Sequence, residues 1–450
     1  MKQEHKIALL GLGTVGSGVW KILSEKKDML LARTEHQFTI KKILVKDLKK
    51  KRSVSVPSSF FVSKADDILK DPEIDIVVEV MGGHEPAGTY ITQALQAGKA
   101  VVTANKALLA ERGVELFKLA RQKGLSLGFE ASVAGGIPII KSIREGFIGN
   151  QIQELYGIIN GTSNFILSEM TAHGSDFATV LAQAQKEGYA EQNPDFDVKG
   201  IDAAQKLSLL TSICYDVEPP KNGIYVEGID RITPLDIQFA KKLGYVIKLL
   251  AITKAQYFNQ PHSGAEGEAP SGLPVEGATR APVIDARVHP TMIPEKHPLA
   301  DVSGIYNAIF LKGDAVGETM FLGRGAGSMP TASAVVSDIV MAATGRGTSL
   351  TTASLRPMTL QSIEDLQSEY YLRFSVIDKP GVLAEIANCL GDADISIAAV
   401  YQRERDLGSR VPIVVMTHEA LEKNVREALK KIDELESVLD ESVLIRVLKR

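Results

Sequence analysis

The segment 184–206 concentrates side chains that could bind a polar substrate and exchange a proton with it. Asn-Pro and glycine turns bring Glu191, Asp197 and Asp202 close together in sequence, and Lys206 follows. Asp202 and Lys206 are four residues apart in a helical stretch, so they share one face, and spacing alone favours an exposed salt bridge. Three neighbouring acids, however, are costly without a cationic partner such as a substrate ammonium or Lys206. The segment is therefore a candidate substrate site.

A glycine-rich loop near the start of the chain has the spacing of a dinucleotide-binding turn. It follows the apolar run 7–10, opens a helical stretch, and consists of Gly11, Leu12, Gly13, Thr14, Val15 and Gly16. The first glycine permits a tight turn, the second lets the backbone approach a pyrophosphate, and the third lets the helix pack on the strand. The alternative is a glycine turn without a ligand.

Basic residues follow the second predicted strand, where an acid is usual in units that bind NAD. This strand, 38–45, is followed by Lys46, Asp47 and a run of bases that ends at Arg52. A base placed first favours the 2′-phosphate of NADP, whereas Asp47 leaves NAD use open. The alternative is a solvated surface loop. Thr103 and Lys106 follow a later strand at its carboxyl end, where ligands bind in such sheets, so both are cofactor candidates.

Strands and helices alternate over the first 130 residues. Strand-like runs at 7–10, 38–45, 74–80, 100–103 and 125–129 enclose amphipathic stretches at 15–33, 89–97 and 108–123. This pattern predicts an α/β fold with a Rossmann-type, doubly wound parallel sheet in residues 1–130. Residues 131–324 form an expected α+β substrate and dimerisation domain, with helices at 138–146, 176–187, 201–215 and 233–251 and strands at 153–159 and 308–311.

The remaining segments have distinct compositions. Residues 256–282 are rich in glycine, proline and alanine and suggest a flexible insertion, whereas 325–345 contain a helix expected to return to the nucleotide-binding unit. Residues 346–368 are a predicted polar linker. Residues 369–450 follow the order strand, helix, strand, strand, helix, strand, which predicts a ferredoxin-like unit.

Several motifs together resemble those of the homoserine dehydrogenase family. The segment 184–206 matches the family pattern at every defined position, including its terminal lysine, and the segments 11–16, 103–106, 129–138 and 323–332 match in the same order. The resemblance covers nearly the whole chain. It implies an oxidoreductase that interconverts L-homoserine and aspartate 4-semialdehyde with NADP(H) preferred and NAD(H) also accepted, in threonine, methionine and isoleucine biosynthesis.

The resemblance also implies roles for single residues. Lys206 would be the general acid/base and Asp197 would orient it, while Gly188 and Glu191 would hold the amino-acid end of the substrate and Asp202 its hydroxyl end. Gly304 would lie near the nicotinamide. A monovalent cation, typically Na⁺, would bind at Glu130, Val133, Gly135 and Ile137, a set of oxygen ligands that suits such an ion.

Residues 369–450 resemble an ACT domain, whose amino-acid effectors bind at the turn between its first strand and first helix. Pro380 suits this helix start. In this pathway threonine is the expected effector, and a homo-oligomer, dimer or tetramer, is expected. The alternative is a dimerisation module without a ligand. Other hypotheses are a dehydrogenase of another small amino acid, such as aspartate, and a sensor that has lost catalysis; a fused aspartate kinase lacks space before Gly11.

Composition excludes several other classes of protein. The chain has 450 residues, a formal net charge of −4 and 44% hydrophobic residues, so no basic field favours nucleic acid or an anionic membrane. No segment reaches the roughly 18 uninterrupted apolar residues of a membrane span. The two cysteines, Cys214 and Cys389, lie far apart and form no disulfide framework. We expect a cytoplasmic enzyme.

Overall fold

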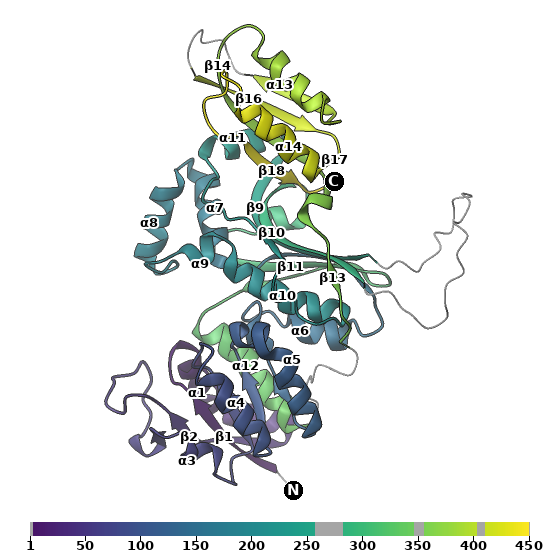
Figure 1. Cartoon of the computed structure of the whole chain (residues 1–450). Coiled ribbons are helices and arrows are strands. Elements are labelled where there is room, and N and C mark those ends of the chain that lie inside the picture. The colour runs from purple at the N-terminus through teal and green to yellow at the C-terminus, as the bar shows by residue number, and fades with distance from the viewer. Residues whose placement is uncertain (1–2, 257–281, 346–354, 403–409, 450) are drawn as a thin grey trace, which may run out of the picture.

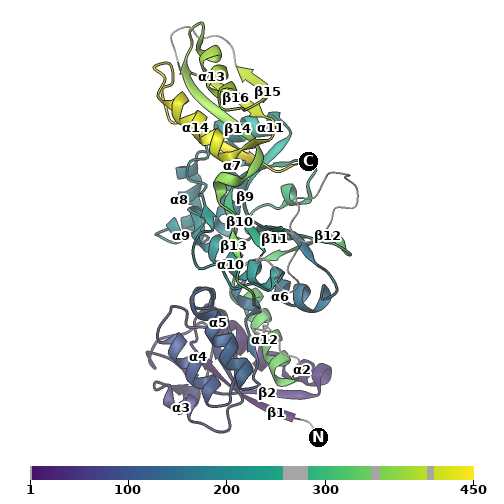
Figure 2. The ribbon, with the colours of Figure 1, turned by 45° about the vertical axis from the view of Figure 1, so that its right-hand side comes forward.

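The computed structural model describes residues 3–256, 282–345, 355–402 and 410–449. Three parts follow one another along the long axis of the molecule: an N-terminal domain, a central domain and a C-terminal domain (Figures 1 and 2). The predicted insertion at 256–282 lies almost wholly outside the described residues. No helix among the described residues is long and apolar enough to cross a membrane.

The N-terminal domain is built on a six-stranded parallel sheet in the order β3-β2-β1-β4-β5-β6, which confirms the predicted Rossmann-type fold. Alternate residues of β1 enter two cores: Ile7 and Leu9 pack with α1 and α12, whereas Ala8 and Leu10 pack with α4 and α5. The strands are β1 (Gln3–Leu10), β2 (His36–Leu44), β3 (Phe61–Val62), β4 (Ile76–Glu79), β5 (Ala100–Thr103) and β6 (Leu127–Gly128). The helices are α1 (Thr14–Glu25), α2 (Lys27–Thr34), α3 (Asp66–Leu69), α4 (Ala87–Gln96) and α5 (Lys106–Gln122).

The helix α12 (Ser328–Ala343) returns to the N-terminal domain, as expected, and packs against α1. A Cβ at Gly18 would lie 2.6 Å from the carbonyl oxygen of Ser328, so glycine allows the two helices to approach closely. The Ser328 hydroxyl donates to the Thr14 carbonyl at 2.7 Å. The predicted single stretch 15–33 is two helices, α1 and α2, which meet at Lys26.

The central domain contributes five long strands of a mixed sheet and a layer of helices. The strands are β7 (Ile152–Ile158), β9 (Tyr245–Gln256), β10 (Val283–Pro294), β11 (Tyr306–Gly313) and β12 (Gly317–Arg324), with short β8 (Tyr225–Val226) and β13 (Thr359–Leu360) paired to β10. The helices are α6 (Ile139–Lys141), which continues as a π-helical turn (Ser142–Gly146), α7 (Gly161–His173), α8 (Phe177–Glu187), α9 (Asp195–Val198), α10 (Ile201–Tyr215) and α11 (Pro234–Lys242).

The predicted helix at 233–251 is wrong in its second half. Helix α11 ends at Lys242, and Gly244 adopts φ +80°, a left-handed conformation that reverses the chain before β9. Alternate residues of β9 then enter two cores: Ile247 and Leu249 pack on one face and Leu250 on the other. This period of two, with pairing to β7 and β10 on either side, makes the segment a strand.

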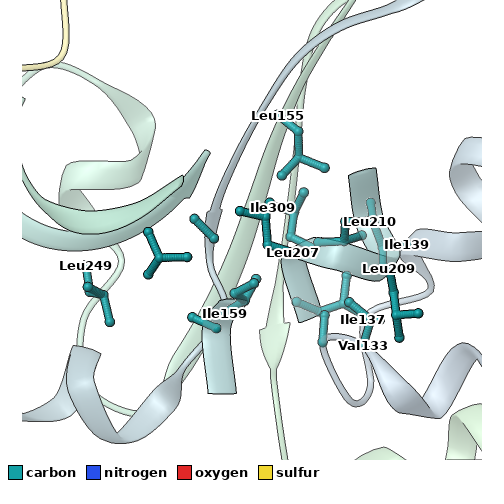
Figure 3. Close-up of a cluster of buried hydrophobic side chains, with 14 of the residues drawn as sticks. Val133, Ile137, Ile139, Leu155, Ile159, Leu207, Leu209, Leu210, Leu249 and Ile309 are labelled. Atoms are coloured by element: carbon teal, nitrogen blue, oxygen red, sulfur yellow. The ribbon is translucent and has the colours of Figure 1, made fainter. Parts of the chain in front are cut away.

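Helix α10 is fixed by its apolar side chains. Leu207, Leu209 and Leu210 are buried beside residues of the 133–139 loop and of the central sheet (Figure 3). Because these side chains are almost fully buried, the helix is held in one orientation. This packing fixes the direction in which its polar side chains point. The predicted helix 201–215 is confirmed residue for residue.

The C-terminal domain has the predicted order of elements. It comprises β14 (Gln367–Ile377), α13 (Val382–Gly391), β15 (Ile397–Gln402), β16 (Arg410–Thr417), β17 (Ala420–Leu421), α14 (Glu422–Asp433) and β18 (Val443–Val447). Its sheet is continuous with the central one, because β18 pairs in parallel with β10 through Arg446 and Thr291. The C-terminal domain is therefore joined to the central domain by main-chain hydrogen bonds.

Candidate active site

The three glycines of the 11–16 loop have different environments. Gly11 has φ +104°, which side chains rarely allow, and its amide donates to the Leu44 carbonyl at 3.0 Å. A Cβ at Gly16 would lie 2.5 Å from the Gly11 carbonyl oxygen, so only glycine lets α1 begin so close to β1. Gly13 has no atom within 4 Å of its Cβ position. The open space at the N terminus of α1, beside exposed Thr14, fits a pyrophosphate.

Cationic side chains follow β2 beside this loop. β2 ends at Leu44, the register partner of Leu10, so exposed Lys46 lies just beyond the strand that neighbours the loop. The Arg52 guanidinium donates to the Asp47 carbonyl at 2.6 Å and stacks over the Phe61 ring at 4.9 Å. In a Rossmann domain this edge faces the ribose that carries the 2′ group.

A buried carboxylate ties the ends of β4 and β5 together. Glu79 is fully buried and accepts from the Thr103 hydroxyl at 2.6 Å and from two amides of the following turn. The Thr103 hydroxyl in turn accepts from the Asn105 amide at 3.0 Å. Thr103 therefore stabilises the turn between β5 and α5. Lys106, the first residue of α5, directs its ammonium toward Asp202 of the central domain, at 3.2 Å.

Asp202 and Lys206 form a buried ion pair on the first turns of α10. Their charged atoms are 2.7 Å apart, and the side chains are only 8% and 12% exposed, so the simple exposed salt bridge is excluded. Burial opposes ionisation of Asp202, but Lys206 and Lys106 outweigh it and lower its pKa to about 2. The Lys206 ammonium also donates to the Ile159 carbonyl at 2.8 Å.

Asn160 joins the two aspartates of the site and was not predicted. Its side-chain nitrogen donates to Asp197 at 2.7 Å and to Asp202 at 2.9 Å. Its oxygen accepts from the Ser163 amide at 2.8 Å and caps α7. Burial raises the pKa of Asp197. Lys206 is thus oriented directly by Asp202 and the Ile159 carbonyl, and Asp197 is linked to this pair through Asn160.

These groups line a cavity of about 510 Å³ between the N-terminal and central domains. Its wall includes Ala104, Lys106, Ala131, Ser132, Gly135, Asn160, Thr162, Gly188, Tyr189, Asp197, Asp202, Lys206, Asn307, Arg324 and Gly327. The linked group of Asn160, Asp197, Asp202 and Lys206 from the central domain therefore meets Lys106 of the N-terminal domain in one space. Such a cavity can hold a small charged molecule beside the cofactor loop.

Of the predicted substrate and nicotinamide residues Gly188, Glu191 and Gly304, only Gly188 lines the cavity. Gly188 ends α8 with φ +79° and lines the cavity, whereas Glu191, three residues later, is exposed and does not line it. Gly304 has φ +62° and is held behind the wall, where its carbonyl accepts from the Asn164 side chain at 3.0 Å.

The loop predicted to bind sodium uses its carboxylate internally. Both Glu130 oxygens accept backbone amides, from Ile140 at 2.8 Å and from Lys141 at 2.9 Å. Burial raises the pKa of Glu130 to about 7. Its other three predicted ligands lie in the same loop: Val133, Gly135 and Ile137. Within the described residues no group of three or more His, Cys, Asp or Glu side chains could hold a metal ion.

Comparison with known proteins supports this architecture along the whole chain. The profile of the homoserine dehydrogenase family matches residues 138–340, that of its NAD-binding domain matches 11–130, and that of the ACT domain matches 370–436. The homoserine dehydrogenases of Helicobacter pylori and Synechocystis are 42% and 41% identical over 99% and 98% of this chain, covering 100% and 99% of theirs. The crystal structure of a homoserine dehydrogenase from Thiobacillus denitrificans is 41% identical with a TM-score of 0.87, covering 99% of this chain and 98% of that one. The chain therefore belongs to the homoserine dehydrogenase family.

Proposed function

We propose that the chain reduces L-aspartate 4-semialdehyde to L-homoserine, and catalyses the reverse reaction, with Lys206 as the general acid/base. The observation that carries this proposal is the position of the Lys206 ammonium, which lines the cavity between the nucleotide-binding domain and the central domain. When bound, the coenzyme supplies the hydride for reduction. Lys206 donates a proton to the substrate oxygen as the alcohol forms and removes it in the reverse direction.

The hydrogen bonds of Lys206 support this role. An ammonium has three N–H donors, and within the described part of the chain two of them bind Asp202 and the Ile159 carbonyl. The third is left for a substrate oxygen. Asp202 keeps the ammonium in place and, with it, positions the hydroxyl-bearing end of the substrate. Gly188 on the cavity wall would bind the amino-acid end, and Glu191, exposed three residues later, would have to turn toward the cavity to join it.

NADP(H) is the proposed preferred coenzyme, with NAD(H) also accepted. The glycine environments fit a pyrophosphate, and Lys46 and Arg52 provide positive charge at the edge of the sheet beside it. A 2′-phosphate would form charge-assisted hydrogen bonds with these bases. Asp47, exposed between them, would suit the hydroxyl of NAD(H) instead.

A monovalent cation at the 130–137 loop is a weaker fit. The Glu130 carboxylate already accepts one amide hydrogen on each oxygen, so a sodium ion would depend mainly on the backbone carbonyls of Val133, Gly135 and Ile137. Such ligands suit a hard cation. Comparing kinetics in sodium salts with kinetics in salts of a large organic cation would test the site.

We further propose that the ACT domain binds L-threonine as a feedback inhibitor in a homo-oligomer, dimer or tetramer. The turn between β14 and α13 fits an amino-acid carboxylate, because Gly381, the residue before α13, adopts φ +98° and is exposed together with Lys379 and Pro380. Inhibition requires that threonine prefer an arrangement of lower activity.

Removal of residues beyond about 367 should abolish inhibition. It also removes Arg373, which binds the fully buried Asp236 of α11 at 2.6 Å. Loss of activity in that truncation would therefore not argue against threonine binding. Calorimetry on the full chain decides the point, and the absence of amino-acid binding there would make the ACT domain structural only.

The activity is tested by following NADPH oxidation with aspartate 4-semialdehyde, repeated with NADH and with millimolar threonine. We expect turnover with both coenzymes, higher specificity for NADPH, and inhibition by threonine. Absence of turnover with the semialdehyde, together with activity on oxaloacetate and ammonium, would instead identify an aspartate dehydrogenase.

A further inference from the structure

The segment 225–229 lies between the C-terminal domain and the turn that carries the catalytic aspartates. On its outer side, Arg446 of β18 forms an ion pair with Glu227 at 2.9 Å, and Arg426 of α14 donates to the Tyr225 hydroxyl at 2.7 Å. The Arg446 side chain is 2% exposed and is held in place by the fully buried Glu422. Buried Arg446 and half-exposed Arg426 therefore hold one side of the segment.

The inner side of the segment contacts the turn that links α9 to α10. The Ile229 amide donates to the Val198 carbonyl at 2.8 Å. A Cβ at Gly228 would lie 2.5 Å from that same oxygen, and a Cβ at Gly200 would lie 3.1 Å from the Val226 side chain. Because both Gly228 and Gly200 lack a side chain, the backbone of the 225–229 segment packs directly against the backbone of the turn.

This turn sets the positions of both aspartates in the cavity. Asp197 precedes Val198 in α9, and Asp202 lies in the first turn of α10, directly after the left-handed Gly200. Because the contact is tight, a displacement of the 225–229 segment moves the turn as well. Asp202 holds Lys206, so such a displacement also reaches the proposed general acid/base.

We infer that Tyr225 and Glu227 are positioning residues for the reaction, through which the C-terminal domain sets the geometry of Asp197, Asp202 and Lys206. The inference rests on the proposed function of Lys206. The competing explanation is that β10 alone holds the segment, since the Glu227 amide also donates to the Val288 carbonyl at 2.8 Å. The two explanations differ in what happens when only the side-chain contact is changed.

The test compares Glu227→Gln with a matched control, Arg231→Gln. Glu227→Gln keeps the shape of the side chain and the backbone bond to β10 but weakens its contact with Arg446. Arg231 lines, with Tyr225 and Glu227, a separate cavity of about 920 Å³ between the central and C-terminal domains. It forms an ion pair with Glu441 at 2.9 Å, but both side chains are at least 70% exposed. The control therefore removes a charge pair between the same domains without contacting the turn.

We expect Glu227→Gln to lower kcat roughly 3- to 30-fold, the range produced by residues that couple distant sites. Hydrogen exchange should be faster in peptides covering 197–206 and unchanged in the N-terminal domain, and coenzyme affinity should be unaltered. Arg231→Gln should stay within about twofold of the starting enzyme in kcat, because exposed pairs contribute little.

Gly228→Ala perturbs the same contact from the catalytic side and leaves both arginines in place. It should reproduce the kinetic defect, and combining it with Glu227→Gln should give less than the product of the two effects, because both act on one contact. If Glu227→Gln matched Arg231→Gln in both kcat and exchange at 197–206, β10 alone would position the turn and the inference would fail. Failure of the proposed function would appear separately, as undiminished turnover by Lys206→Ala, because the exchange measurement does not depend on chemistry.

Discussion

Replacing Asp202 by asparagine should destabilise the chain at neutral pH as well as impair catalysis. The pKa of Asp202 falls from its ordinary 3.8 to about 2, because the attraction of Lys206 and Lys106 exceeds the cost of burial. A lowering of this size corresponds to roughly 2–3 kcal/mol of stability. This stabilisation is fully present above about pH 4 and is lost as the pH falls through 2. Asparagine removes it and deprives Lys206 and Lys106 of the carboxylate that they share.

Asp197→Asn provides the matched comparison within the same turn. Burial raises the pKa of Asp197, so its charged form costs stability at neutral pH, and asparagine can keep the hydrogen bond with Asn160 without that charge. The midpoint of thermal unfolding at pH 7.5 should therefore fall by about 5 °C in Asp202→Asn and should stay level or rise in Asp197→Asn. Both variants should lose kcat.

Thermal scans of the two variants, made in one buffer and with coenzyme absent, show whether the unfolding midpoint falls in one variant only. An equal loss of stability in both variants would refute the electrostatic reasoning. Each substitution replaces one carboxylate oxygen by an amide nitrogen, so the two variants differ only in the surroundings of the lost charge. An unchanged midpoint for Asp202→Asn would show that Lys206 and Lys106 find other partners. Measurement of kcat alone could not separate these outcomes, because both aspartates border the cavity.

Three further predictions concern the acid/base group, the coenzyme and a buried lysine. Lys206→Ala should lower kcat by at least about 10²-fold with coenzyme binding nearly unchanged, and near-normal turnover would remove its assignment. The double variant Lys46→Ala with Arg52→Ala should weaken NADPH far more than NADH, by about 10-fold or more for each charged hydrogen bond lost, measured by fluorescence titration; equal effects would identify a solvated loop. Burial lowers the pKa of Lys248 to about 8, so between pH 8 and 10.5 the unfolded chain holds a proton that the folded chain has released, and stability should rise with pH by roughly 3 kcal/mol. That rise should be absent in Lys248→Met, and an identical pH dependence in both proteins would contradict it.

Sequence patterns predicted the elements whose burial follows a regular period. Five strands of the N-terminal sheet, helix α10 and the main elements of the C-terminal domain were found as expected, whereas the two-residue strands β3 and β17 were too short to give a pattern. Helix α7 was missed because it is buried on several sides, with Ser163, Asn164 and Phe165 consecutive and buried, so it lacks an apolar stripe. Its cap, Asn160, was missed with it. The preference of asparagine for the residue before a helix was the available signal.

The contacts between domains could not be predicted from local patterns. Lys106 belongs to the N-terminal sheet and Asp202 to the central domain, so their 3.2 Å contact depends on how the two domains dock. Docking is decided by packing between surfaces that are distant in sequence, to which spacing rules do not apply. The same reason hid the contact of Arg446 with Glu227.

The Asp202 carboxylate forms ion pairs with lysines of both domains. One oxygen binds Lys206 of its own helix at 2.7 Å, and the other binds Lys106 at the start of α5 at 3.2 Å. A displacement of the N-terminal domain by a few ångströms would break the second contact, because charge pairs in a partly buried site weaken steeply with solvent entry. Asp202 would then pair with Lys206 alone. The electrostatic environment of the proposed acid/base therefore depends on the approach of the domain that carries the coenzyme loop. Both ion pairs of Asp202 are complete only when the two domains are docked.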